Sequence, residues 1–345
     1  MGDPAGIGPE VILKAAAAIR RAADRPRLLV IGDLGVMQAT AERLGGSYPR
    51  LYEWTPEPSA SATGATADAA TPPPRGNRLA VLSVGRLAAR AYRPGRPTVA
   101  GADAAYRYIV AGARMALAGA VDALVTAPIS KEWLNRAGHS FNGHSELLAE
   151  LAKVREWRMM FSGDRLKLVL VTVHMPLAQV SRALTAARVF GSIRLLEAHL
   201  RTNFGLAKPR IAVLGFNPHA GENGLFGDEE RKAITPAIRR ARRAGIDAFG
   251  PLAPDTAFIR PRGEFGFDAA VAMYHDQGLI ALKTLEFDRA VNLTLGLPFI
   301  RTSPDHGTAF AIAGRGEADP ASMRAALRYA ARAAANRRAA ARHAA

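Results

Sequence analysis

The sequence predicts an α/β protein, and three observations lead to that class. Short apolar runs recur along the chain and end in Gly, Pro or a polar residue, as buried parallel strands do. Stretches with helical patterning separate these runs. At 345 residues, the chain is long enough for two domains or one large two-lobed unit.

The composition narrows the class of protein further. Hydrophobic residues make up 49% and charged residues 22%, as in ordinary soluble globular proteins. The chain has no cysteine, so any metal must be bound by His, Asp or Glu. No apolar run reaches the roughly 18–20 residues that span a bilayer, and no secretory signal is visible. We therefore expect a cytoplasmic enzyme without a membrane partner.

The formal net charge is +16, and part of it lies in one tail. Residues 324–345 contain six arginines and no acid. Such a charge suits nucleic acid or an acidic ligand. The arginines do not alternate with aromatic residues as in single-strand binding surfaces. We therefore favour a solvated basic face and expect no nucleic-acid partner, although a positive field would help recruit a phosphorylated substrate or a dinucleotide.

The first twenty residues predict a Gly/Pro-rich turn followed by a helix, with Pro9 in the first helical turn. Gly6 and Gly8 give G-x-G, but the remainder of G-x-G-x-x-G is absent and no strand precedes it, so the pattern argues against a classical Rossmann fold. The turn could present N–H groups to a ligand at the helix N-terminus. An ordinary turn is the alternative.

The next 100 residues alternate between strand and helix patterns. Apolar runs at 27–33 and 79–84 predict strands, and helices are expected at about 34–45 and 101–118. Residues 55–77 are rich in Ala, Ser, Thr and Pro with almost no large apolar residue, which indicates a flexible surface insertion.

Two groups of candidate ligand-binding residues follow a predicted strand at 121–126. Ala127-Pro128 ends the strand, and Lys131 begins a helix just beyond it, where α/β proteins bind ligands. His144 and Ser145 stand at the head of another helix, with Ser145 as a plausible N-cap, and together suit a phosphate or carboxylate. The alternatives are that Lys131 is a solvated lysine, that Ser145 only caps its helix and that His144 is a surface residue.

Three histidines follow apolar segments. His174 ends an apolar strand pattern beginning at 166, His219 lies in the loop after a strand at 211–214, and His275 follows the apolar segment at 268–274. A single histidine of this kind is usually a hydrogen-bonded loop residue, but three neutral imidazoles can hold a catalytic divalent ion. Asp255, in a predicted turn, or Asp276 could orient an imidazole.

The stretch from Ala272 to Thr308 concentrates polar residues beside turns and apolar runs, which is typical of a ligand site. It contains His275, Asp276, Lys283, Asn292, Arg301, Asp305 and His306. Residues 321–345 predict an Ala/Arg-rich helix with a frayed end.

Several of these segments resemble the 4-hydroxythreonine-4-phosphate dehydrogenase family of vitamin B6 synthesis. The resemblance runs from GDPAGIGPE at 2–10 to GRGEADP at 314–320 and includes GHSELLAE, NPHAGENG, GPLAPDTAF, MYHDQGL and NLTLGLPFIRTSPDHGTA. Two features depart from the family: the strand before GDPAGIGPE is absent, and residues 55–77 look inserted.

The resemblance implies a two-lobed α/β/α architecture with a central cleft, like that of isocitrate and isopropylmalate dehydrogenases. Residues 1–127 with 276–345 would form the dinucleotide lobe, and 128–275 the metal and dimerisation lobe. It also implies a homodimer whose active site lies at the subunit interface, with metal ligands from both subunits.

Residue by residue, the resemblance assigns three groups. His174, His219 and His275 match metal ligands. The substrate-binding positions are matched by His144, Ser145, Lys283, Asn292 and Arg301. Asp305, His306 and Gly307 match the region near the dinucleotide. Ser145 stands where threonine is common and keeps the hydroxyl.

The implied reaction is the oxidation of a small phosphorylated hydroxy amino acid by NAD or NADP, with Zn, Mg or Co as the metal. The residues leave the metal, the choice of dinucleotide and the general base open, with Lys131 and Asp276 as candidate proton carriers. The alternative is the same scaffold acting on erythronate 4-phosphate or a cis-dihydrodiol, such as that of terephthalate.

Overall fold

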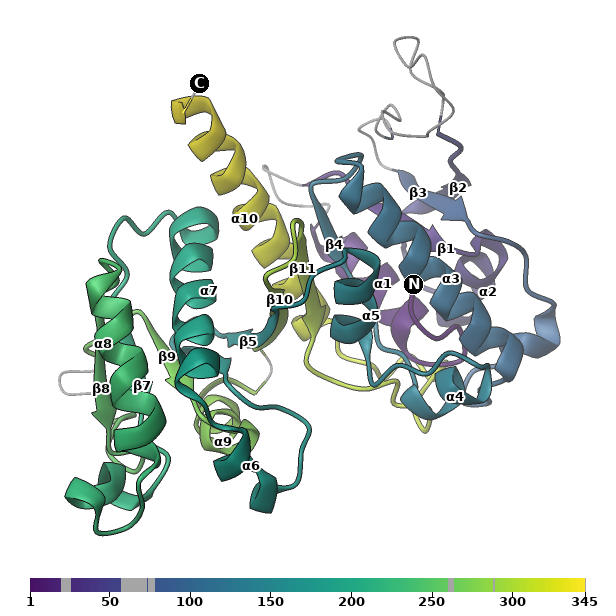
Figure 1. Cartoon of the computed structure of the whole chain (residues 1–345). Helices are drawn as coiled ribbons and strands as arrows, with labels where there is room; N and C mark the ends of the chain where they lie inside the picture. The colour runs from purple at the N-terminus through teal and green to yellow at the C-terminus, as the bar shows by residue number, and fades with distance from the viewer. Residues whose placement is uncertain (20–25, 57–72, 74–77, 260–263, 288, 345) are drawn as a thin grey trace. The chain divides into compact units, whose positions relative to one another are not determined.

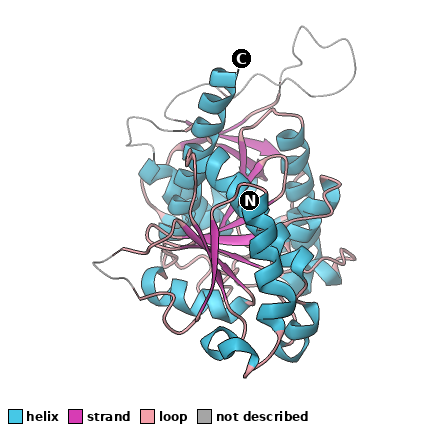
Figure 2. Cartoon of the chain, turned by 60° about the vertical axis from the view of Figure 1, so that its left-hand side comes forward, coloured by secondary structure: helices cyan, strands magenta, loops and turns pink. Residues whose placement is uncertain are grey.

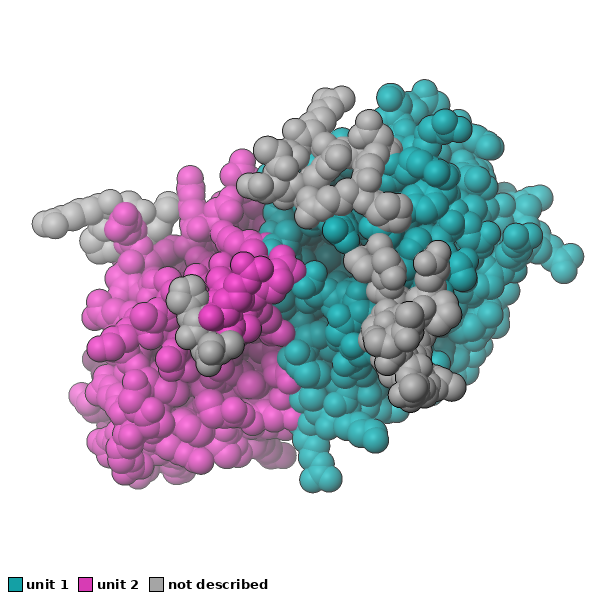
Figure 3. Space-filling view, turned by 90° about the horizontal axis from the view of Figure 1, so that it is seen from above, with its two compact units in different colours: residues 1–155, 297–331 teal, residues 156–296, 332–345 magenta. Residues whose placement is uncertain are grey.

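The computed structural model describes residues 1–19, 26–56, 73, 78–259, 264–287 and 289–344. These residues form two compact units, shown in different colours in Figure 3. Unit 1 comprises residues 1–155 and 297–331, and unit 2 comprises residues 156–296 and 332–345. Helices and strands build both units, which confirms the α/β class (Figure 2).

The units do not coincide with the lobes expected from the resemblance. Residues 128–155, including helix α5, belong to unit 1, and residues 276–296, including most of helix α9 and all of strand β10, belong to unit 2. The assignment of a dinucleotide lobe and a metal lobe stays a prediction. Most of the predicted insertion at 55–77 lies outside the described residues.

Unit 1 alternates strands and helices as the sequence predicts. Its elements are α1 (Gly8–Ile19), β1 (Leu29–Gly32), α2 (Leu34–Leu44), β2 (Arg50–Glu53), β3 (Arg78–Ser83), η1 (Ala89–Ala91), α3 (Val99–Leu117), β4 (Ala123–Val125), α4 (Lys131–Arg136), α5 (His144–Leu151) and β11 (Ile300–Pro304). Strand β2 was not predicted, because its burial is only partial and its pattern carries little apolar signal.

The strands of unit 1 pair in parallel. A three-stranded sheet has the order β1-β3-β2, and β4 pairs with β11. Between β1 and α2 the sharp turn is held by Asp33, whose side chain accepts from the N–H groups of Val36 and Leu87 at 3.2 and 2.7 Å. This N-cap explains why the strand beginning at Leu29 passes directly into a helix.

Unit 2 contains a larger share of the strands. Its elements are β5 (Arg158–Ser162), β6 (Lys167–Leu170), α6 (Leu177–Ala183), α7 (Ala186–Phe204), β7 (Ile211–Leu214), η2 (Pro218–Gly224), the π-helical turn η3 (Glu230–Ile234), α8 (Thr235–Arg243), β8 (Ala248–Leu252), β9 (Ala269–Ala272), α9 (His275–Glu286) and β10 (Val291–Leu295).

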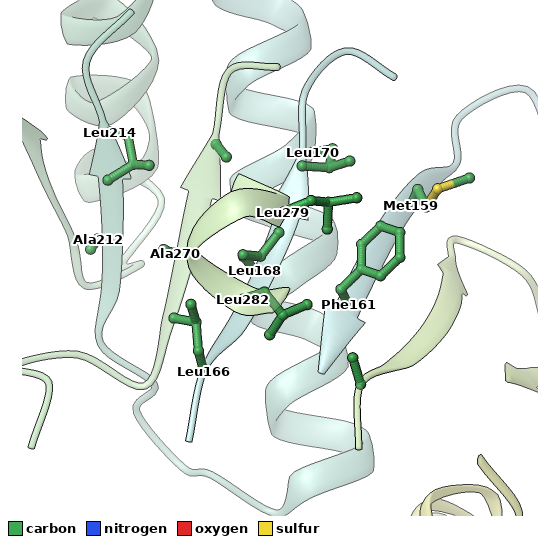
Figure 4. Packing of buried hydrophobic residues seen from close by; sticks show 12 residues of the cluster. Met159, Phe161, Leu166, Leu168, Leu170, Ala212, Leu214, Ala270, Leu279 and Leu282 are labelled. Carbon is green, nitrogen blue, oxygen red and sulfur yellow. The ribbon is translucent and has the colours of Figure 1, made fainter. Parts of the chain in front are cut away.

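The strands of unit 2 lie in the order β10-β5-β6-β9-β7-β8. The pairs that involve β5 are antiparallel and the pairs from β6 to β8 are parallel. Figure 4 shows Leu168 and Leu170 of β6 packing with Leu279 and Leu282 of α9, so one face of the sheet is covered by this helix. Helix α9 begins at His275, directly after β9 ends at Ala272, so its start lies at the C-terminal edge of the parallel strands.

Strand β6 is shorter than the sequence pattern suggested: it ends at Leu170, not at His174. Its parallel neighbour β9 ends at Ala272, and the next N–H, that of Met273, is taken by the side-chain oxygen of Gln277 at 2.7 Å. The N–H groups of Val171 and Thr172 still donate to the carbonyls of Ala272 and Met273 at 2.9 and 3.2 Å, but regular strand pairing ends here and the chain bends toward His174. The apolar pattern could not reveal this, because the limit is imposed by a distant strand.

The Ala/Arg-rich C-terminal helix is confirmed as α10 (Ala321–Ala344), whose residues are divided between the two units. Among the described residues, no helix is both long and apolar enough to cross a membrane.

Candidate active site

The predicted site residues fall into two groups, one on each unit. Unit 1 carries Lys131, His144, Ser145, Arg301, Asp305, His306 and Gly307, and unit 2 carries His174, His219, His275, Asp276, Lys283 and Asn292. Each group is described within its own unit.

His174 and His275 come together in unit 2. Because β6 and β9 are parallel neighbours with Leu170 opposite Ala272, the residues after both strands reach the same edge of the sheet. The two imidazole rings lie with their centroids 6.0 Å apart. With metal–nitrogen bonds of about 2.1 Å, two imidazoles on one ion have centroids roughly 5–6 Å apart. This pair therefore fits a shared cation.

His219 lies in an unusual backbone turn. Five consecutive residues, from His219 to Asn223, have positive φ angles between 42° and 81°. Four of them are not glycine, and each such residue costs about 1 kcal/mol or more in this conformation. A left-handed turn of this length persists only where surrounding contacts fix it, and such strain is concentrated at functional sites.

Two glutamates fix the start of that turn. The buried Glu230 accepts from the N–H groups of Phe216 and Asn217 at 2.7 and 2.8 Å, and from the Asn217 side chain at 2.8 Å. Glu229 accepts from the same amide at 2.8 Å and from the hydroxyl of Ser181. These hydrogen bonds hold the pKa of Glu229 below its usual value. The loop that presents His219 is thus held by its downstream residues.

Gln277 connects the His275 region with the same loop. Its side-chain nitrogen donates to the Gly215 carbonyl at 2.7 Å, while its oxygen accepts from Met273. The rings of Phe216 and Tyr274 add an edge-to-face contact at 6.1 Å. The segments before His219 and around His275 are therefore fixed to one another.

The histidine partners fit metal-ligand chemistry. Nδ1 of His275 lies 2.7 Å from Asp276 Oδ1, and Nδ1 of His219 lies 3.0 Å from Glu222 Oε2. A carboxylate on one ring nitrogen leaves the other nitrogen to bind a metal. Within the described ranges of this one chain, however, no group of three or more His, Asp or Glu is arranged to hold an ion. The three-histidine set stays a prediction.

Arg301 is the centre of the group on unit 1. It lies on β11, is 4% exposed, and donates to the Thr126 hydroxyl from Nε at 3.2 Å and from a terminal nitrogen at 2.8 Å. Burial lowers the pKa of this guanidinium to about 9, so it stays protonated at pH 7. A buried cation of this kind favours an anionic ligand.

His144 lies within the electrostatic reach of Arg301. Burial, with the nearby charge of Arg301 as the next cause, lowers the pKa of His144 well below its usual value, so the ring is neutral at pH 7. Its Nε2 atom is buried and has no hydrogen-bond partner among the described residues. A buried polar atom of this kind is uncommon unless a ligand completes it.

The expectation that Ser145 caps α5 was wrong. The helix begins at His144, its N-cap is Gly143 with φ 157°, and no side chain caps it. Ser145 instead lies in the first turn and is buried. A Cβ at Gly143 would lie 3.7 Å from Lys131 Cε, so the stem of Lys131 runs beside this helix start. Lys131 begins α4, as expected, behind the N-cap Ser130.

The loop before α1 contacts both strand ends of this group. The N–H of Asp3 donates to the Pro128 carbonyl at 2.9 Å, and the N–H of Ile7 donates to the Thr308 carbonyl at 3.0 Å. Asp3 itself is buried and accepts from the Ala5 N–H, and burial raises the pKa of its carboxyl to about 6. Sequence patterns did not single out Asp3, because its burial depends on strands far along the chain.

The segment predicted to lie near the dinucleotide follows β11. The N–H of Asp305 donates to the Ser322 hydroxyl at 3.1 Å. His306 carries a buried Nε2 without a hydrogen-bond partner in the described chain, and a Cβ added at Gly307 would meet nothing within 4 Å. An orphaned polar atom beside open space fits a bound ligand such as a dinucleotide.

The remaining predicted residues lie on unit 2. Lys283 is on α9, with its ammonium 5.7 Å from the Phe287 ring centre, and Asn292 lies on β10 opposite Phe161 of β5. Asp255 lies in a turn after β8, as predicted. No described contact links Asp255 to the histidine pair.

An α/β chain with paired histidines at strand ends and a buried arginine beside a neutral imidazole has the features of an enzyme for anionic substrates. Comparison with known proteins identifies the family. The family model described as pyridoxal phosphate biosynthetic protein PdxA matches residues 24–330, and the chain belongs to this family.

Relatives agree over nearly the whole length. The chain is 47% identical over 334 residues to a 4-hydroxythreonine-4-phosphate dehydrogenase of Geobacter metallireducens, covering 96% of this chain and 93% of the relative. It is 44% identical over 330 residues to a D-threonate 4-phosphate dehydrogenase of Salmonella typhimurium, covering 96% of each. The crystal structure of 4-hydroxythreonine-4-phosphate dehydrogenase from Klebsiella pneumoniae matches with a TM-score of 0.82 at 40% identity, covering 97% of this chain and 98% of that one. These likenesses identify the chain as an oxidoreductase of the dehydrogenase class.

Proposed function

We propose that the chain oxidises 4-phosphooxy-L-threonine with NAD or NADP and a divalent metal, in the biosynthesis of pyridoxal 5′-phosphate. The observation that carries this proposal is the cationic group of unit 1: a buried charged Arg301 beside the neutral, unsatisfied ring of His144. An anion with several oxygens, such as a phosphate or carboxylate, can accept from both. Family membership and the named relatives support the same substrate.

In this proposal Arg301 and Lys131 supply positive charge to the substrate anions, while His144, Ser145 and Asn292 contribute hydrogen bonds and Lys283 a further charge. Arg301 is pre-positioned, since two of its nitrogens donate to Thr126 before any ligand binds. Such fixed donors need little reorganisation when substrate arrives.

His174, His219 and His275 would hold the metal, and residues 305–307 would border the dinucleotide. The bound metal supplies Lewis acidity, and the dinucleotide supplies the hydride acceptor. The secondary alcohol loses its carbinol hydride and its hydroxyl proton, which gives a β-keto acid. Loss of carbon dioxide from that acid gives 3-amino-2-oxopropyl phosphate. We propose Lys131 or Asp276 as the group that carries the hydroxyl proton.

A second substrate is favoured by the Salmonella relative, whose name specifies D-threonate 4-phosphate. A phosphorylated hydroxy acid presents the same phosphate and carboxylate to Arg301, Lys131 and His144. The difference lies at the substrate's second carbon. The proposed cytoplasmic location and a homodimer with a shared active site belong to the same proposal.

Metal removal tests the proposal. Excess chelator should abolish NAD(P)H formation from 4-phosphooxy-L-threonine, and added divalent metal should restore it. The variant His219→Ala should lower kcat/KM at least a hundredfold, while the control His343→Ala, near the C-terminus, should stay within twofold of the unaltered chain. Full activity in excess chelator would contradict the proposed chemistry.

A further inference from the structure

A second cationic surface on unit 1 lies outside the group around Arg301. Between η1 and α3 the chain makes a tight turn, Tyr92 to Thr98, in which the N–H of Arg96 donates to the carbonyl of Arg93 at 3.0 Å. Both arginines are exposed, and the turn contains no acidic residue. The turn therefore directs two positive charges into solvent.

Two further arginines join this turn from other elements. A Cβ at Gly314 would lie 2.7 Å from the Pro94 side chain and 3.4 Å from Cδ of Arg43, so these three residues are in contact. The residue after Gly314 is the exposed Arg315. The four arginines 43, 93, 96 and 315 form what we call the arginine patch.

The patch adjoins the segment predicted to lie near the dinucleotide. The N–H of Gly95 donates to the Ala5 carbonyl at 2.8 Å, and a Cβ at Gly95 would lie 2.9 Å from the carbonyl of Phe310. Thr308, two residues earlier, accepts from Ile7 of the same N-terminal loop. In Figure 1 the loop after β11 runs beside the N-terminal segment. A ligand along residues 305–308 would thus meet the patch at one end.

The four guanidinium groups are not neutralised within the described part of unit 1. No ion pair or side-chain hydrogen bond joins any of them to a described residue. Glu42 and Glu317 are their sequence neighbours and are exposed. A cluster of exposed positive charges raises the local concentration of anions.

We propose that the arginine patch binds the 2′-phosphate of NADP and makes the chain prefer NADP to NAD. This inference rests on the proposed function, since it names the dinucleotide of the same reaction. A phosphate monoester carries a charge of about −1.5 to −2 at pH 7, and arginine matches its oxygens two at a time. NAD has a neutral hydroxyl there, for which dinucleotide sites often use a carboxylate. The turn from Tyr92 to Thr98 offers none.

Binding calorimetry on the whole chain, without substrate, tests the inference. NADPH should bind at least tenfold more tightly than NADH, and the difference should shrink as ionic strength rises. Arg96→Ala and Arg315→Ala should each weaken NADPH binding about tenfold while leaving NADH within twofold. The matched control is Arg114→Ala, an equal charge change about 24 Å along α3 from its N-cap.

Equal affinity for the two dinucleotides would overturn the preference, as would patch variants that behave like Arg114→Ala. In both cases the proposed dehydrogenation could stand, because NADH still binds. If neither dinucleotide binds, the patch assignment and the proposed function both fail. The same calorimetry with adenosine 2′,5′-bisphosphate and adenosine 5′-monophosphate repeats the comparison without the nicotinamide. Equal binding of these two compounds also counts against the patch.

Discussion

Burial sets the charge states of the two residues that carry the unit 1 site, with opposite consequences. Arg301 is buried, yet its pKa of about 9 leaves it a cation at pH 7. His144 is neutral, because burial and the arginine's charge both disfavour its protonated form. One fixed cation and one neutral imidazole give an anion both charge and an adaptable hydrogen bond.

The neutral state of His144 predicts a pH dependence of stability. The unfolded ring titrates near its ordinary value of about 6.5, whereas the folded ring resists protonation. As pH falls below about 6.5, the unfolded chain therefore binds a proton that the folded chain does not, and the free energy of unfolding decreases. His144 should account for up to about 2 kcal/mol of the loss between pH 7 and pH 5.

Urea unfolding of the unaltered chain and of His144→Asn at both pH values checks this contribution. The loss on acidification should be smaller in the variant, whatever its stability at pH 7. Buried His199, with a pKa lowered to about 3, acts in the same direction. Asp3 acts in the opposite direction, because its raised pKa favours the folded state as pH falls. An unchanged pH difference in His144→Asn would refute the assignment.

At the scale of elements, the left-handed turn from His219 to Asn223 is the least regular part of the candidate site. Backbone hydrogen bonds span the turn, such as that from the N–H of Ala220 to the Asn217 carbonyl at 3.1 Å. Glu230 fixes its start by accepting three hydrogen bonds from Phe216 and Asn217. The buried carboxylate of Glu230 thus holds the strained turn in place. The histidine is thereby presented from rigid backbone.

The strain predicts that glycine improves stability at one position. Ala220 has φ 55° and ψ 40°, a conformation that glycine adopts without steric cost. Ala220→Gly should raise the free energy of unfolding by up to about 1 kcal/mol. The same change at exposed Ala335, inside α10, should lower it by about 1 kcal/mol. Denaturant unfolding compares the two, and a loss in both variants would show that the turn is unstrained.

Much of this architecture could be predicted from sequence, because apolar runs identify buried strands directly. Strand β7 was predicted at its observed bounds, and helices α2 and α3 within two residues. The site was predictable as residue types after strand ends, including His174 and His275. The side chains that hold these residues in place could not be predicted, because Glu230, Gln277 and Asp3 act through long-range contacts that leave no local sequence pattern. For the same reason the end of β6 and the N-cap of α5 were predicted wrongly.

At the scale of the whole molecule, the candidate site residues form two groups, one on each unit. Unit 1 carries Arg301, His144 and the arginine patch, and unit 2 carries the three histidines, Lys283 and Asn292. The segments that carry them alternate along the chain, from Lys131 to Gly307. Cationic groups recur in both sets, and in that sense the net charge of +16 includes residues that a phosphorylated substrate would use.

We propose above that this chain is a metal- and dinucleotide-dependent dehydrogenase of a phosphorylated hydroxy amino acid. The most direct measurement is a steady-state assay with 4-phosphooxy-L-threonine, D-threonate 4-phosphate and unphosphorylated 4-hydroxythreonine, each with NAD and NADP and a series of divalent metals. We expect metal-dependent reduction of the dinucleotide, with the highest kcat/KM for 4-phosphooxy-L-threonine and almost none for the unphosphorylated compound. Equal rates with and without the phosphate, or no dependence on metal, would contradict it.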